Sequence, residues 1–166
     1  LFLAFRELRE MRPKAHLVVI GRGTKQETVA LAPVKRLGLE DCVHFTGYLD
    51  GDDYVGTLRA LDIGVFLVPG SDGTCRAARE LLAMGCPMVV ADRGMLREMV
   101  RHAHDGLVCD GSPEQLRAQL LTLAASKKLR QTFGQHARAG ALSLEAQARQ
   151  VLARYEQILE LEKHGK

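Results

Sequence analysis

Short apolar runs alternate along the chain with longer amphipathic segments. Most of the runs are continuously apolar, which is typical of strands that are covered on both faces of a sheet. Strands joined by helix-length segments in this way predict an α/β domain with a parallel sheet. The expected strands are His16–Ile20, Cys42–Thr46, Ile63–Val68, Pro87–Ala91 and Gly106–Cys109.

The segments between the strands have their apolar residues at helical spacing. The chain opens with such a segment, LFLAFRELREM. After Asp110 no further strand is expected, so the fold should end in a helical C-terminal region. The other expected helices are Glu27–Leu37, Asp52–Leu61, Thr74–Met84, Met95–Arg101, Pro113–Ala125, Lys128–Ala139 and Leu144–Lys163.

Five residues are expected to begin, bend or end these helices. Ser112 and Ser143 can cap helix N-termini with their hydroxyl groups. Pro33 should kink its helix or mark the true start of it, because proline has no backbone N–H. Gly38 and Gly85 are plausible helix stops, since glycine adopts the left-handed conformation without steric cost.

Composition narrows the class of protein. The 166 residues suffice for one domain with a sound core, and 46% hydrophobic and 26% charged residues are ordinary for a soluble globular protein. A net charge of +3 is too small and too scattered to indicate binding to nucleic acid or to a membrane. No apolar run reaches the roughly 18 residues of a membrane span. Four cysteines without a CxxC pair indicate free thiols in a reducing cytosol.

Ligands of parallel sheets bind beyond the carboxyl ends of the strands, and three loops there carry suitable residues. The first is Gly21-Arg22-Gly23, where two glycines let the backbone approach a ligand and Arg22 can pair with phosphate. A dinucleotide fingerprint would need a further glycine where Gln26 stands. A tight turn without a ligand is an equally good interpretation of this loop.

The second loop is Gly47-Tyr48-Leu49. Its backbone groups can recognise the edge of a base, with Tyr48 or Leu49 packed on the ring. A plain turn with a half-buried tyrosine explains the same residues.

The third loop gives the strongest signal and lies in VFLVPGSDGTCRAARELLAMGCPMVVA. Asp72 stands at the mouth of an expected helix and Glu80 lies two turns further on. A helix N-terminus attracts phosphate, and a carboxylate beyond it can bind sugar hydroxyls, so this loop predicts a nucleotide-sugar site. The backbone amides expected to point into the cleft belong to Gly73, Thr74 and Cys75.

A structural interpretation of the third loop remains open. Asp72 can be a simple N-cap, and Glu80 can form an ion pair with Arg76 at i,i+4. Elsewhere, His102 and His104 next to Asp105 suggest a metal only weakly, because no further ligand has matched spacing.

Together these motifs resemble the C-terminal half of a family 4 retaining glycosyltransferase. The resemblance rests on HLVVIGRG, CVHFTGYL, LDIGVFLVPGSDGTCRAARELLAMGCPMVVADRGMLREMV and DGLVCDGSPEQL, in this order. Such enzymes have the GT-B architecture, two Rossmann-like domains with the active site in the cleft between them. The resemblance therefore implies that residues 1–166 form a single Rossmann-like domain that binds the donor.

The resemblance also implies roles for the site residues. Glu80 would hold the ribose hydroxyls of the nucleotide, and Asp72 would contact the donor sugar, although the family has glutamate there. The turn Gly73-Thr74-Cys75 and the adjacent Arg76 would approach the sugar and diphosphate, and the loop Gly47–Leu49 would contact the base. Family members hold the diphosphate with amides and cationic side chains, so neither a metal nor a cofactor is expected. The nucleoside diphosphate sugar is the substrate.

The same resemblance implies missing parts. The chain begins without Met and inside a helix, so it is expected to be a piece of a longer protein. An N-terminal acceptor domain, an Arg and a Lys that clamp the diphosphate, and the first central strand of the sheet would precede it. The expected partners are the nucleotide sugar and that domain, with no nucleic acid. The expected location is the cytoplasm, with any peripheral membrane contact made by the other half.

Three other functions are compatible with the pattern. A nucleotide-sugar epimerase shares the two-domain architecture and would epimerise its substrate without an acceptor. A non-catalytic binding module would use Asp72 and Glu80 only as a cap and an ion pair. A dinucleotide-dependent oxidoreductase is the weakest alternative, because the glycine fingerprint is incomplete.

Overall fold

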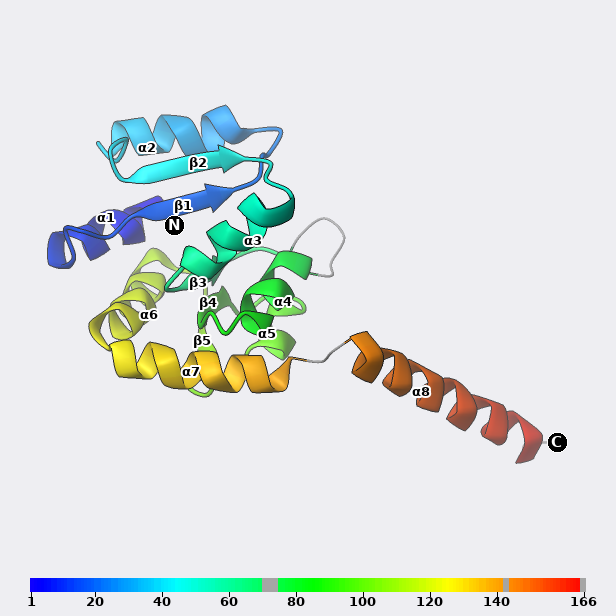
Figure 1. Cartoon of the computed structure of the whole chain (residues 1–166). Coiled ribbons are helices and arrows are strands. Elements are labelled where there is room, and N and C mark those ends of the chain that lie inside the picture. The colour runs from blue at the N-terminus through cyan, green and yellow to red at the C-terminus, as the bar shows by residue number, and fades with distance from the viewer. Residues whose placement is uncertain (70–74, 142–143, 165–166) are drawn as a thin grey trace.

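The computed structural model describes residues 1–69, 75–141 and 144–164, and its strands form two parallel sheets (Figure 1). One sheet pairs β1 with β2, and the other has the order β3-β4-β5. Every pairing is parallel, and all five predicted strands are confirmed. Their bounds are β1 Leu17–Ile20, β2 Val43–Gly47, β3 Gly64–Phe66, β4 Met88–Ala91 and β5 Gly106–Cys109.

The predicted helices are confirmed to within a few residues at their ends. The largest difference is in the predicted helix Glu27–Leu37, which is α-helical only from Ala32 to Arg36. At the fifth helix, Val100 is extended and buried instead of helical. The bounds are α1 Phe2–Met11, α2 Ala32–Arg36, α3 Gly51–Ala60, α4 Arg76–Ala83, α5 Leu96–Met99, α6 Pro113–Ala125, α7 Lys127–Gly140 and α8 Leu144–His164.

The core lies on both faces of the central strand β4, whose four residues are 0% exposed. On one face, Val89 packs in an apolar cluster with Phe5 of α1 and Leu116 of α6. On the other, Val90 packs in a second cluster with Leu81 of α4 and Leu96 of α5. Helices therefore cover both faces of the sheet, which confirms the predicted layer order and explains the continuously apolar strands.

The segment around Pro33 contains a π-helical turn, Glu27–Leu31, followed directly by α2. The amide of Ala32 donates to the carbonyl of Glu27, five residues back. Pro33 stands in the first turn of α2, where a missing N–H leaves no helical hydrogen bond unmade. Of the two predicted outcomes, Pro33 therefore marks the start of the regular helix.

The predicted helix ends are confirmed where the structure describes them. Gly38 and Gly85 have φ angles of +65° and +77°, in the left-handed region. The Ser112 hydroxyl accepts a hydrogen bond from the amide of Gln115 at 3.2 Å. Ser126 caps α7 in the same way, and the predicted cap Ser143 lies outside the described residues.

The two sheets are separated by an apolar slot between the edges of β1 and β3. Both edges line a cavity of about 1100 Å³, together with Leu1, Phe5 and Leu8 of α1. All four residues of β1 are only half-buried, unlike those of β4, because this edge strand has no neighbour on the slot side. The described strands therefore form two separate parallel sheets, with the cavity between β1 and β3.

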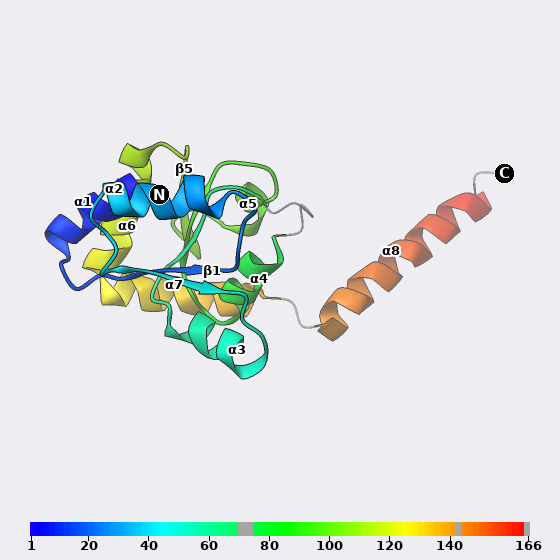
Figure 2. The ribbon, with the colours of Figure 1, turned by 90° about the horizontal axis from the view of Figure 1, so that it is seen from above.

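Helix α8 projects away from the body of the protein (Figures 1 and 2). Five large apolar side chains are exposed along it, namely Val151, Leu152, Tyr155, Ile158 and Leu159. Within the described ranges, neither α8 nor any other helix combines the length and apolar character required to cross a membrane.

All four cysteines are free thiols and all are buried, which confirms the prediction of unpaired thiols. Cys86 lies between β4 and α4, and its burial raises its pKa from the ordinary value of 9.0 to about 12. Burial likewise raises the pKa of Cys109. Both thiols therefore favour the protonated, unreactive form.

The raised pKa of Cys86 predicts a loss of stability in alkali. The unfolded thiol ionises from about pH 9, whereas the folded one resists ionisation until about pH 12, so ionisation favours unfolding across this window. The free energy of unfolding should fall by on the order of 1–2 kcal/mol between pH 7.5 and 10.5 through this group. Urea titrations at both pH values test this, and Cys86→Ala should lose less than the unaltered chain. Equal losses in the two proteins would contradict the prediction.

Candidate functional site

The first two predicted loops meet at the carboxyl ends of β1 and β2. The Gly21 amide donates to the Gly47 carbonyl at 2.8 Å. Both glycines have positive φ angles, +95° and +69°, which other residues rarely adopt. A Cβ atom added to Gly47 would lie 3.3 Å from Nε of Arg22, so the guanidinium packs closely over this glycine. The structure thus joins the two loops into one surface.

The side chains of these loops are accessible to a ligand. Tyr48 is 79% exposed, while Arg22 and Gly23 are also exposed and Leu49 is half-buried. Gly21, Tyr48 and Leu49 also line the cavity between the two sheets. The predicted half-buried tyrosine is therefore wrong, and Tyr48 offers its ring to the solvent.

The third loop is described only from Cys75 onward. Asp72, Gly73 and Thr74 lie outside the described residues. Cys75 has φ 50° and ψ 42°, the left-handed conformation, and the whole residue is only 2% exposed. Its side chain packs in the second core cluster. Left-handed residues other than glycine are uncommon and gather at functional sites.

Glu80 has a partner on another helix. The Tyr54 hydroxyl of α3 donates to Oε2 of Glu80 on α4 at 2.5 Å. Burial raises the pKa of Tyr54 to about 12, helped by the hydrogen bond to Glu80 and its charge, while Arg76 acts in the opposite direction. The phenol therefore keeps its proton at neutral pH and acts as a donor.

Tyr54 also connects Glu80 to the cavity. Tyr54 is half-buried against the apolar cluster that contains Leu58, one turn further along α3, and Ile20, at the end of β1. Its side chain lines the cavity together with Gly21 and Tyr48. The Glu80 carboxylate is therefore one hydrogen bond away from a residue that lines the same cavity as the two glycine loops.

Tyr54 was not among the candidate residues predicted from the sequence. It lies four residues before Leu58, on the apolar side of an amphipathic helix, where an aromatic residue indicates core packing. Only its phenolic oxygen distinguishes Tyr54 from an aromatic residue that serves packing alone. Because a buried tyrosine usually has a hydrogen-bond partner, this oxygen is the one sequence signal that indicates a polar role for Tyr54.

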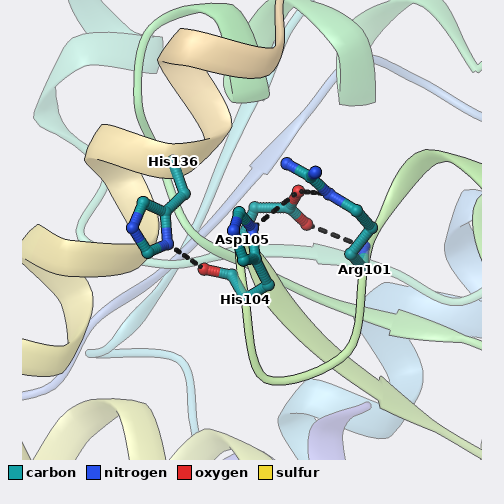
Figure 3. Close-up of polar contacts among 4 residues, drawn as sticks. All are labelled: Arg101, His104, Asp105 and His136. Atoms are coloured by element: carbon teal, nitrogen blue, oxygen red, sulfur yellow. Dashed lines mark hydrogen bonds and ion pairs between the residues drawn. The ribbon is translucent and has the colours of Figure 1, made fainter.

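The histidine-containing link after α5 is a structural cluster (Figure 3). Asp105 is 5% exposed and accepts hydrogen bonds from the Arg101 amide at 2.7 Å and from Arg101 Nε at 2.8 Å. The ring of His104 stacks on that of His136 in α7, with centroids 4.1 Å apart. Nδ1 of His136 donates to the His104 carbonyl at 2.8 Å, so the link is fastened to α7.

These contacts give the link a role in the fold. Nδ1 of His102 accepts a hydrogen bond from the Val108 amide at 3.0 Å, which ties the link to β5.

Within residues 1–69, 75–141 and 144–164, no three His, Cys, Asp or Glu side chains are grouped so that they can hold a metal ion.

The model of the family described as glycosyl transferases group 1 matches residues 1–140 of this chain. Among curated proteins, mannosylfructose-phosphate synthase of Agrobacterium fabrum is 33% identical over 144 residues, which is 82% of this chain and 31% of that protein. The chain spans about a third of the length of the curated relatives it matches.

Solved structures share the fold. The Anabaena protein HepE, crystallised with UDP and glucose, superposes with a TM-score of 0.77 at 21% identity, over 93% of this chain and 44% of that one. The C-terminal domain of LpcC, a group 1 glycosyl transferase of Francisella tularensis, gives 0.69 at 23% identity, over 82% and 73%. These likenesses show a Rossmann-like fold of the kind found in GT-B glycosyltransferases.

Proposed function

This chain belongs to the family of group 1 glycosyl transferases, and from this premise we propose that it is the donor-binding part of such an enzyme. The parent enzyme would transfer a hexose from a nucleoside diphosphate sugar to an acceptor, with retention of the anomeric configuration. One observation carries the proposal: the Tyr54 hydroxyl donates to Glu80, and the Tyr54 side chain lines the same cavity as Gly21 and Tyr48 of the two glycine loops. HepE, which has the same fold, was crystallised with UDP and glucose, and this supports a nucleotide-sugar ligand.

The proposed chemistry is electrostatic. Breaking the bond between sugar and diphosphate builds negative charge on the leaving group, and fixed donors stabilise that charge more in the transition state than in the ground state. Arg22, Arg76 and the amides of Gly73 to Cys75 would provide these donors. Glu80 would hold the ribose, and Asp72 would orient the sugar for transfer. No metal or organic cofactor takes part in the proposed reaction.

The acceptor is assigned to the part of the parent protein that this chain does not include. The chain spans about a third of its curated relatives, and the active site of a two-domain enzyme lies between the domains. The 166 residues should therefore bind the donor but transfer little or no sugar. The proposed location is the cytoplasm, with any contact to a membrane made through the other half.

Calorimetric titration with UDP, GDP and ADP, without metal, tests the proposal. Saturable binding of one nucleotide is expected, and its identity gives the base of the donor. If none binds, the titration is repeated with the longer parent protein, which would add the expected arginine and lysine. Absence of binding there as well would overturn the proposal.

Asp72→Asn should separate the two proposed carboxylate roles. Because Asp72 is assigned to the sugar, the variant should bind the nucleotide sugar more weakly, with little change for the bare nucleotide. The measurement is calorimetry with both ligands. Asp41→Asn is the matched control, since Asp41 is exposed and lies before the amino end of β2, whereas the candidate loop follows its carboxyl end. A larger effect on the bare nucleotide would mean that the two acids have exchanged roles.

A further inference from the structure

We propose that Tyr54 is a positioning residue that aims the Glu80 carboxylate at the ribose hydroxyls and thereby sets the preference for ribonucleotides over 2′-deoxyribonucleotides. This inference rests on the proposed function, in which Glu80 binds the ribose. It concerns a residue on α3 that lies outside the three loops found from the sequence.

The contact joins two helices through one side-chain hydrogen bond. The Tyr54 hydroxyl donates to Oε2 of Glu80, and a hydrogen bond to a carboxylate is stronger than one between neutral groups. A glutamate side chain has three rotatable bonds, and a half-buried one at a helix surface samples several rotamers. A hydrogen bond from a separate helix therefore removes freedom that Glu80 would otherwise lose on binding its ligand.

Tyr54 is itself held firmly. Its ring packs in the apolar cluster with Leu58 and Ile20, and its amide donates to the Asp50 carbonyl at 3.1 Å. Because α3 follows β2 directly after the loop Gly47–Leu49, Tyr54 links Glu80 to the loop that is proposed to contact the base.

The bond to Tyr54 leaves room for a ligand. An ionised carboxylate has two oxygens with about four lone-pair sites in total. Tyr54 occupies one site on Oε2, so Oε1 and the second site of Oε2 remain available to two neighbouring hydroxyl groups. The phenol keeps its proton, since burial and the charge of Glu80 raise the pKa of Tyr54 to about 12. Tyr54 therefore donates a hydrogen bond to Glu80 and orients it over the whole physiological pH range.

Tyr54→Phe removes the hydroxyl and keeps the ring, so the packing against Leu58 should survive. The experiment titrates the full chain with UDP, GDP and ADP and with their 2′-deoxy forms. The variant should bind the preferred ribonucleotide about 10-fold more weakly, the lower end for hydrogen bonds to charged groups. Its affinity for the 2′-deoxy form should change less. The preference for the ribonucleotide, given as the ratio of the two affinities, should therefore decrease. Tyr155→Phe, on the exposed α8, is the matched control and should change neither affinity.

A double-mutant cycle separates positioning from a general structural effect. In the Glu80→Gln background, Tyr54→Phe should add little, because the group that it orients is already lost. The inference would be overturned if Tyr54→Phe weakened binding of the ribonucleotide and the 2′-deoxyribonucleotide equally, which leaves the ratio of their affinities unchanged. Full additivity of Tyr54→Phe with Glu80→Gln would overturn it as well. If the unaltered chain binds and Glu80→Gln weakens it while Tyr54→Phe does not narrow the ratio, this inference alone fails. If neither the chain nor its longer parent binds any nucleotide, the proposed function fails and this inference falls with it.

Discussion

Replacement of Glu80 by glutamine is expected to weaken binding of the preferred nucleoside diphosphate by about 1–3 kcal/mol, or roughly 5- to 150-fold. The carboxylate accepts hydrogen bonds at both of its oxygens, whereas the amide accepts at one and presents donors at the other. Two ribose hydroxyls and the Tyr54 hydroxyl would then compete for a single acceptor. Calorimetric titration of the full chain measures the difference.

The result is informative only if the variant keeps its fold. Glu80 is half-buried, and its side chain has one described hydrogen bond. The Glu80→Gln variant should therefore unfold at a temperature close to that of the unaltered chain. Glu40→Gln is the matched control, because Glu40 is exposed in the turn before the amino end of β2, whereas the candidate loop follows the carboxyl end of that strand. An affinity unchanged by Glu80→Gln would remove the ribose role and favour a purely structural pair with Tyr54.

The strands were predictable because burial and chain pattern coincide in them. β4 reads as an uninterrupted apolar run, and all four of its residues are inaccessible. The split between the two sheets follows from no property of the residues in β1 or β3, which are as apolar as those of a paired strand. It depends on what lies between them in space, and the sequence indicated it only through the strand implied by the family resemblance.

The candidate site was predictable only in part. The positions of the loops Gly21–Gly23 and Gly47–Leu49 after strands indicated that both could bind a ligand. In the structure these loops meet, and the Gly21 amide donates to the Gly47 carbonyl at 2.8 Å. The pairing of Tyr54 with Glu80 spans 26 residues and depends on how α3 packs beside α4, which periodicity within either helix does not specify. The left-handed conformation of Cys75 was equally hidden, since cysteine does not favour it.

Replacement of Gly134 by alanine is expected to lower the free energy of unfolding by about 1–3 kcal/mol, the range for overpacked cores. Gly134 lies in α7 where that helix meets the end of α4, and a Cβ atom added there would lie 2.2 Å from the carbonyl oxygen of Gly85. The obstacle is backbone, so it cannot turn away as a side chain would. Gly85 is also restrained by its φ angle of +77°. The gain of about 1 kcal/mol in helix propensity offsets only part of the cost.

Gly140→Ala provides the control within the same helix. An added Cβ atom at that position meets only the flexible end of Arg101, at 3.5 Å, so the variant should be neutral or slightly more stable. Thermal unfolding should show a drop of about 2–12 °C for Gly134→Ala and none for Gly140→Ala. Because Arg138 of α7 also donates to the Met84 carbonyl at the end of α4, displacement of α7 should move the helix that carries Glu80. Gly134→Ala should therefore weaken nucleotide binding as well. Unchanged stability of this variant would contradict the prediction and show that α7 and α4 are not held at the observed distance.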